Sequence, residues 1–117
     1  MSEEESQAVY EHYHVPGPGR VLFQAATANL NPRAVTTVNF KSETRAPLLV
    51  VGGGEDHAVP PSLAKEAATR QSKAKSAIEC REYPGRSHYT LGQDGWEAVA
   101  DHALDWAAKH AAARTAT

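Results

Sequence analysis

The sequence predicts a small α/β fold, in which two parallel strands carry flanking helices and short helices precede them. An uninterrupted apolar run at 48–51 ends in three glycines, which is typical of a strand buried on both faces of a parallel sheet. A second stretch, 77–83, alternates apolar and polar residues, as a half-exposed strand does. Because a helical pattern lies between them, we expect a crossover connection and parallel pairing.

Length, composition and charge restrict the classes of protein. The chain has 117 residues, of which 41% are hydrophobic and 22% charged, a composition that predicts one small globular domain rather than a disordered chain. A net charge of −2 gives no indication of nucleic-acid binding. No apolar run reaches the roughly 20 residues that span a bilayer. The acidic N-terminus lacks the apolar core of a secretion signal. We therefore expect a cytoplasmic protein without nucleic-acid or membrane partners.

The N-terminal part of the chain is predicted to be helical. Ser2 and Glu5 have the spacing of a capping box, which predicts a helix over residues 2–14. A Pro/Gly cluster ends it, and a second short helix is predicted over 20–30. A loop with a weakly β-prone piece at 35–40 follows.

The elements after the first strand follow from helix start signals and from alternation. Pro61 suits the first turn of a helix over 61–74. The final helix is expected to begin at Asp94, where Glu97 completes a capping box, and to run to about Ala112. Its apolar face should bury residues at helical spacing, namely Trp96, Val99, Ala103, Trp106 and Ala107.

One cysteine, Cys80, excludes an internal disulfide framework and a multi-cysteine zinc site. It shares the apolar face of the second predicted strand with Ile78. We therefore expect a buried, unreactive thiol rather than a nucleophile.

Two residues with catalytic chemistry follow the two predicted strands. Asp56 comes shortly after the first strand, and His88 comes shortly after the second. Because the carboxyl ends of parallel strands meet at one edge of the sheet, we expect the two side chains to lie within hydrogen-bonding distance. An Asp that orients a His and stabilises its charged form makes up two thirds of a nucleophile–His–Asp triad. The simpler interpretations are that Asp56 caps the following helix and that His88 is a surface loop residue.

These segments resemble the α/β-hydrolase superfamily. Residues 53–60 (GGEDHAVP) are similar to the family's acid loop, Gly-x-x-Asp-x-x-Val-Pro, and residues 83–89 (YPGRSHY) are similar to the loop that carries its catalytic His. The segment 95–106 resembles the family's last helix. The order, acid and then His, each after a strand, is also the order in that family.

The resemblance implies a partial α/β-hydrolase fold. Residues 46–112 would form its C-terminal β-α-β-α part, residues 1–45 a cap or lid segment, and residues 113–117 a frayed tail. Asp56 and His88 would be the acid and the base of its triad. The intact enzyme would hydrolyse an ester-like small molecule, and we expect no metal or organic cofactor.

The family's nucleophile motif, Gly-x-Ser-x-Gly, does not occur in the sequence. We therefore expect a truncated or split hydrolase that is inactive alone, because little catalysis remains without a nucleophile and an oxyanion hole. Two strands cannot cover both faces of the apolar run at 48–51, and an uncovered strand edge invites pairing. Self-association, pairing with a separate N-terminal chain, or poor stability is the expected consequence.

Other functions remain open from the sequence. The chain would be a non-catalytic interaction module if it kept a hydrolase scaffold without the chemistry, or a small enzyme if Asp56 and His88 worked as an acid–base pair without a nucleophile. Ser87 adjoins His88, but neighbouring side chains rarely meet. His12 and His14 do not share a helix face, which disfavours a metal site. The glycine run at 52–54 lacks the third glycine of a dinucleotide-binding loop.

Overall fold

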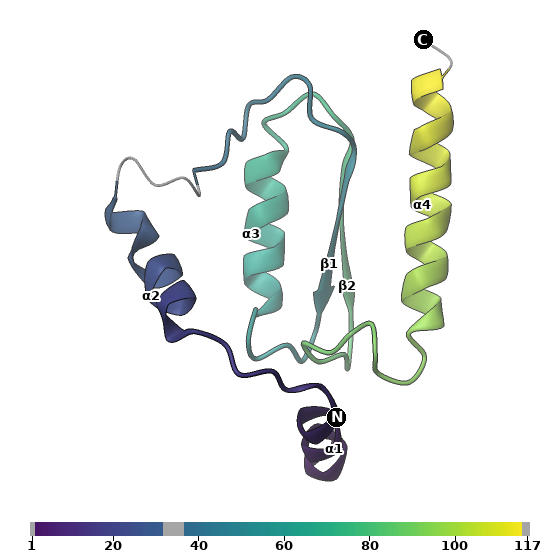
Figure 1. Cartoon of the computed structure of the whole chain (residues 1–117). Coiled ribbons are helices and arrows are strands. Elements are labelled where there is room, and N and C mark those ends of the chain that lie inside the picture. The colour runs from purple at the N-terminus through teal and green to yellow at the C-terminus, as the bar shows by residue number, and fades with distance from the viewer. Residues whose placement is uncertain (1, 32–36, 116–117) are drawn as a thin grey trace. The chain divides into compact units, whose positions relative to one another are not determined.

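The computed structural model describes residues 2–31 and 37–115 and divides the chain into two compact units, Met1–Asn39 and Phe40–Thr117. The described residues form four α-helices, one short 3₁₀ helix and a two-stranded parallel sheet (Figure 1). A small α/β fold is therefore present, as predicted. No helix in the described ranges combines the length and the apolar character needed to cross a bilayer.

The first unit contains two helices, α1 (Glu3–Tyr13) and α2 (Gly19–Thr27), and α2 continues into the 3₁₀ turn η1 (Ala28–Leu30). Ser2 Oγ accepts a hydrogen bond from the Glu5 amide, and Glu5 Oε2 accepts one from the Ser2 amide, both at 3.1 Å. The predicted capping box is thus confirmed. Neither α1 nor α2 has a buried residue.

The weakly β-prone piece predicted at 35–40 is not a strand where it is described. Residues 35 and 36 lie outside the described part of the chain, residues 37–39 are irregular, and Phe40 begins a turn.

The second unit is built on strands β1 (Leu48–Gly53) and β2 (Ile78–Tyr83), joined by helix α3 (Pro61–Gln71). The strands pair in parallel from Leu48 opposite Ile78 to Gly53 opposite Tyr83, which confirms the predicted pairing. Pro61 occupies the first turn of α3, as predicted. Ala64 and Ala68 are the buried residues of α3, and Ala64 is small enough for the helix to approach Gly52 of β1 closely.

The predicted burial of the first strand on both faces is wrong for this chain. Leu48, Leu49 and Val50 are half-buried, and Val51 is 37% exposed. Helices α3 and α4 (Glu97–Thr115) lie on opposite sides of the sheet (Figure 1), but a cavity separates α4 from β1. Among the described residues, β1 also has a neighbouring strand on one side and none on the other.

Helix α4 begins three residues later than predicted. Gly95 adopts a positive φ of 74°, a conformation that breaks a right-handed helix, so Asp94 cannot be the N-cap residue. The helix begins at Glu97 and continues to Thr115, past the predicted end at Ala112.

The apolar face predicted for the last helix is buried in part. Val99 is 1% exposed, and Ala103 and Trp106 are half-buried. Trp96 precedes the helix and is 45% exposed, and Ala107 is exposed. The prediction that these two residues belong to the buried face is therefore wrong, because the later start shifts Trp96 into the preceding turn.

Cys80 is exposed, which corrects the predicted burial of its thiol. Its side of the sheet is the side of α3, where Lys65 forms an ion pair with Glu82 at 2.7 Å. Helix α3 does not cover this position of β2, and the Cys80 side chain is therefore open to solvent.

Candidate active site

The carboxyl ends of β1 and β2 bring Asp56 and His88 together. Asp56 follows β1 by three residues and His88 follows β2 by five. His88 Nδ1 lies 2.9 Å from Asp56 Oδ2, a hydrogen-bonding distance. The predicted contact is therefore present, and it joins two loops that are distant in the sequence.

Asp56 is held by its own loop as well as by His88. Its Oδ1 accepts hydrogen bonds from the amides of Ala58 at 2.9 Å and Val59 at 2.8 Å. The hydrogen bond from Val59 is the largest of the effects that lower the pKa of the Asp56 carboxyl, and the bonds from His88 and Ala58 lower it further. Partial desolvation opposes the shift. Asp56 does not cap α3, whose N-cap residue is Pro60. The simpler interpretation of Asp56 as a helix cap is thus wrong.

The His88 ring has one nitrogen engaged and one available. Its side chain is 65% exposed, whereas that of Asp56 is 10% exposed. The carboxylate beside Nδ1 favours the neutral tautomer that carries its proton there. Nε2 has no hydrogen-bond partner among the described residues, so its lone pair is available to accept a proton. This arrangement is the one a general base requires.

The two loops touch through their main chains. A Cβ atom at Gly53 would lie 2.5 Å from the Arg86 carbonyl oxygen and 2.8 Å from that of Ser87, so no other residue fits there without a backbone shift. The Glu55 amide donates to the Arg86 carbonyl at 2.8 Å. The glycine run after the apolar strand was the sequence signal for this approach, although the sequence analysis did not interpret it in this way.

The main-chain hydrogen bonds of the glycine run argue against a phosphate-binding loop. The Gly54 amide donates to the carbonyl of Tyr83, at the end of β2, at 2.9 Å, and the Glu55 amide donates to the Arg86 carbonyl at 2.8 Å. The Asp56 amide donates to the Gly53 carbonyl at 3.2 Å. A phosphate loop needs such amides free to face the ligand. The glycine run therefore lets the two loops pack closely and does not leave amides for a phosphate.

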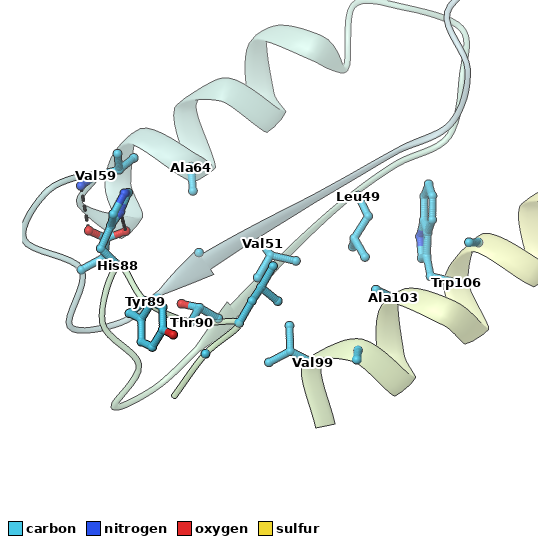
Figure 2. Close-up of a pocket in the computed structure, with 17 residues that line it drawn as sticks. Leu49, Val51, Val59, Ala64, His88, Tyr89, Thr90, Val99, Ala103 and Trp106 are labelled. Carbon is cyan, nitrogen blue, oxygen red and sulfur yellow. Dashed lines mark hydrogen bonds and ion pairs between the residues drawn. The ribbon is translucent and has the colours of Figure 1, made fainter. Parts of the chain in front are cut away.

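A cavity of about 830 Å³ adjoins His88. Figure 2 shows Leu49 and Val51 of β1 on one side of it and Val99, Ala103 and Trp106 of α4 on the other. Tyr89 and Thr90 lie at the end near His88 (Figure 2). The lining is mostly apolar, and its titratable side chains are Asp56, His88 and Tyr89. This combination of an apolar cavity and a few polar groups is typical of a small-molecule site.

The other candidates of the sequence analysis lie outside this arrangement. The Ser87 hydroxyl is hydrogen-bonded to Gln93 Oε1 at 3.3 Å and to the Tyr89 amide at 3.2 Å. His14 Nδ1 is hydrogen-bonded to the Tyr10 carbonyl of its own helix at 3.0 Å. Within residues 2–31 and 37–115, no three His, Cys, Asp or Glu side chains are grouped to hold a metal ion.

A chain of polar contacts between β2 and α4 was not predicted from the sequence. The Tyr83 hydroxyl lies 2.7 Å from His102 Nδ1, and His102 Nε2 lies 3.1 Å from Glu79 Oε1. Glu79 and Tyr83 are on one face of β2 because side chains alternate along a strand. The alternation along β2 could be predicted from the sequence, but the contact with His102 on α4 could not. These bonds hold α4 to β2 and do not reach the cavity.

Comparison with known proteins gives no relative: no family model, no curated protein and no solved structure matches the chain. The functional interpretation therefore depends on the geometry of the site and on the motifs that carry the resemblance.

Proposed function

We propose that Asp56 and His88 are the acid and the general base of an α/β-hydrolase-type centre, which hydrolyses an ester-like small molecule when a nucleophile-bearing segment completes it. The observation that carries this proposal is the 2.9 Å contact between His88 Nδ1 and Asp56 Oδ2, formed at the carboxyl ends of two adjacent parallel strands. Ligand sites of open α/β sheets lie at this edge.

Each residue has a distinct role in the proposed reaction. His88 Nε2 takes the proton of a serine hydroxyl as its oxygen attacks the ester carbonyl, and then gives that proton to the departing alcohol. Water repeats the sequence on the acyl intermediate and releases the acid. Asp56 holds the ring and stabilises the imidazolium, and its lowered pKa keeps the carboxylate ionised.

The nucleophile has to come from outside the described residues. All seven serines of the chain lie in the described ranges, and none is hydrogen-bonded to His88. The free edge of β1 is a suitable place for a completing segment. In the parallel pairing, the main-chain N–H and C=O groups of Leu48 point toward β2, where the Leu48 amide donates to the Ala77 carbonyl at 3.0 Å. The groups of Leu49 and Val51 consequently point to the other edge, beside the apolar cavity.

The test of inactivity uses a fluorophosphonate probe and a p-nitrophenyl ester on the chain alone. We expect no stoichiometric labelling, and ester hydrolysis no faster than that of His88→Ala. Stoichiometric labelling that His88→Ala abolishes would contradict the claim that the chain lacks a nucleophile.

The test of the pair itself is ¹⁵N NMR of the His88 ring in alkaline buffer, in which the imidazole is neutral. We expect Nδ1 to carry the proton in the wild type, and Asp56→Asn to shift the population toward the Nε2–H form. A wild-type ring protonated on Nε2 would overturn the proposed roles of both residues.

An interaction module is the second candidate, and one observation favours it. Helix α2 exposes Val21, Leu22 and Phe23, each 61–76% exposed. Such an apolar surface is typical of a docking helix. The two candidates differ in the coding sequence before Met1: an encoded Gly-x-Ser-x-Gly segment favours the hydrolase, and its absence favours the module.

A further inference from the structure

We infer that Arg86 is a positioning residue, whose guanidinium holds the loop that carries His88 and thereby sets the His88 ring against Asp56. This inference rests on the proposed function of the pair. His88 is 65% exposed, and the hydrogen bond to Asp56 is the contact that fixes its ring among the described residues. The ring position therefore depends on how firmly the loop backbone is held.

The Arg86 side chain binds main-chain carbonyls beyond His88. Nη1 donates to the Thr90 carbonyl at 3.1 Å, and Nη2 donates to the carbonyls of Asp94, at 3.2 Å, and Gly95. The guanidinium therefore spans the turn from residue 86 to the start of α4, and His88 lies inside that turn.

The Arg86 main chain is fixed to the acid loop. Its carbonyl accepts a hydrogen bond from the Glu55 amide at 2.8 Å, and its amide donates to the Tyr83 carbonyl at 3.4 Å. The carbonyl also abuts Gly53. One residue thus joins the loop that holds Asp56, through its backbone, to the loop that holds His88, through its side chain.

The chemistry of the contact requires arginine. No carboxylate in the described ranges forms an ion pair with Arg86, so its charge is stabilised by carbonyl dipoles. The planar guanidinium of arginine has five N–H donors and can reach three carbonyl oxygens at once, whereas the ammonium group of lysine is a compact point charge on a flexible side chain. Thr90, whose carbonyl is one of the acceptors, is buried.

Gln93 strengthens the same turn from inside. Its Oε1 accepts from the Ser87 amide at 3.1 Å and from the Ser87 hydroxyl at 3.3 Å. Thr90 Oγ1 donates to the Ser87 carbonyl at 2.6 Å. The amide and the carbonyl of Ser87, the residue before His88, are therefore both hydrogen-bonded.

The experiment compares the His88 ring in the full-length wild type with Arg86→Met by ¹⁵N NMR, in alkaline buffer and well below the unfolding temperature. We expect Arg86→Met to lose the Nδ1–H signal of His88, because the released loop no longer holds the ring against Asp56. Arg86→Lys should recover part of that signal. Arg70→Met is the matched control, because it removes an exposed guanidinium that pairs with Glu66 on α3, and it should leave the His88 ring unchanged.

The outcomes separate this inference from the proposed function. If the wild type lacks the Nδ1–H form, the proposed pair fails. If the wild type has that form and Arg86→Met keeps it, the pair stands and the positioning role of Arg86 is wrong. Global unfolding of Arg86→Met, seen as loss of the dispersed amide signals of β1, β2 and α3, would also overturn the inference, because it assigns Arg86 a role confined to the loop.

Discussion

The Asp56 carboxylate makes three hydrogen bonds, two to amides of its own loop and one to His88. Bonds of this kind favour the charged form, so the Asp56 carboxylate is stabilised by the protein alone. The loop amides satisfy one oxygen and leave the other for the imidazole.

This lowered pKa predicts a dependence of stability on pH. Above the ordinary value of 3.8, Asp56 is ionised in the folded and the unfolded chain. As the pH falls below 3.8, the unfolded chain takes up the proton first, and stability is lost down to the lower folded-state pKa. We expect the stability difference between wild type and Asp56→Asn to shrink over that range in urea unfolding experiments. A difference that stays constant would show that the hydrogen bonds do not favour the carboxylate.

Single residues were predictable where backbone topology alone placed them. Asp56 and His88 each follow a strand, and parallel pairing brings them to one edge. Arg86 was not predictable, because its role depends on a side chain that reaches carbonyls four to nine residues away. The burial of Cys80 was predicted wrongly, because alternation identifies a face of the strand but not what covers it.

At the scale of elements, α1 has little packing to stabilise it besides its cap. It has 11 residues and no buried one, and isolated helices shorter than about 12–15 residues are marginal in water. The Ser2–Glu5 capping box therefore contributes a large share of its stability.

Ser2→Ala should lower the helical population of α1, since the loss of an N-cap costs about 0.5–2 kcal/mol. The measurement is the ¹³Cα chemical shifts of residues 3–13, and those of α4 should not change. Ser6→Ala, within the same helix, is the control and should not lower the population, because alanine has the higher helix propensity. Unchanged shifts in Ser2→Ala would argue against the cap.

Helix boundaries were less predictable than helices. Asp94 and Glu97 have the spacing of a capping box, as Ser2 and Glu5 do, yet α4 begins at Glu97. Gly95 at positive φ lets the chain turn between them, and its carbonyl accepts a hydrogen bond from the Arg86 guanidinium. The local pattern predicted the start of α1, whose described residues are all unburied, and it failed for α4, where tertiary contacts decide the turn.

At the scale of the whole molecule, the sheet is too small to be self-sufficient. Two strands with few buried side chains give marginal stability, and β1 has one unpaired edge. The sequence predicted the parallel pair and its crossover helix. It could not show the cavity beside β1, because the distance between α4 and the sheet depends on side chains from several elements.

We expect the wild type to self-associate through this edge and Val51→Lys to weaken the association at least tenfold, about 1.4 kcal/mol. A charge pointing from an edge strand opposes strand addition, and Val51 is 37% exposed, which leaves room for lysine. The measurement is sedimentation equilibrium over a range of concentrations.

Leu63→Lys is the matched control, because it adds the same charge at a half-exposed residue of α3 away from the edge. Equal weakening by both variants would indicate a general charge effect. A wild type that stays monomeric at high concentration and melts cooperatively would contradict the predicted association.

The contact between Gly53 and the carbonyls of Arg86 and Ser87 has a consequence for how this site can change over evolution. Because the two loops meet through main-chain atoms, the spacing of their backbones beside Asp56 and His88 does not depend on the exposed side chains of the acid loop. Exposed residues such as Glu55 and His57 can be replaced to suit a different ligand without moving the pair. Gly53 itself has no room for a Cβ atom, so the requirement for glycine at this one position leaves its neighbours free to vary.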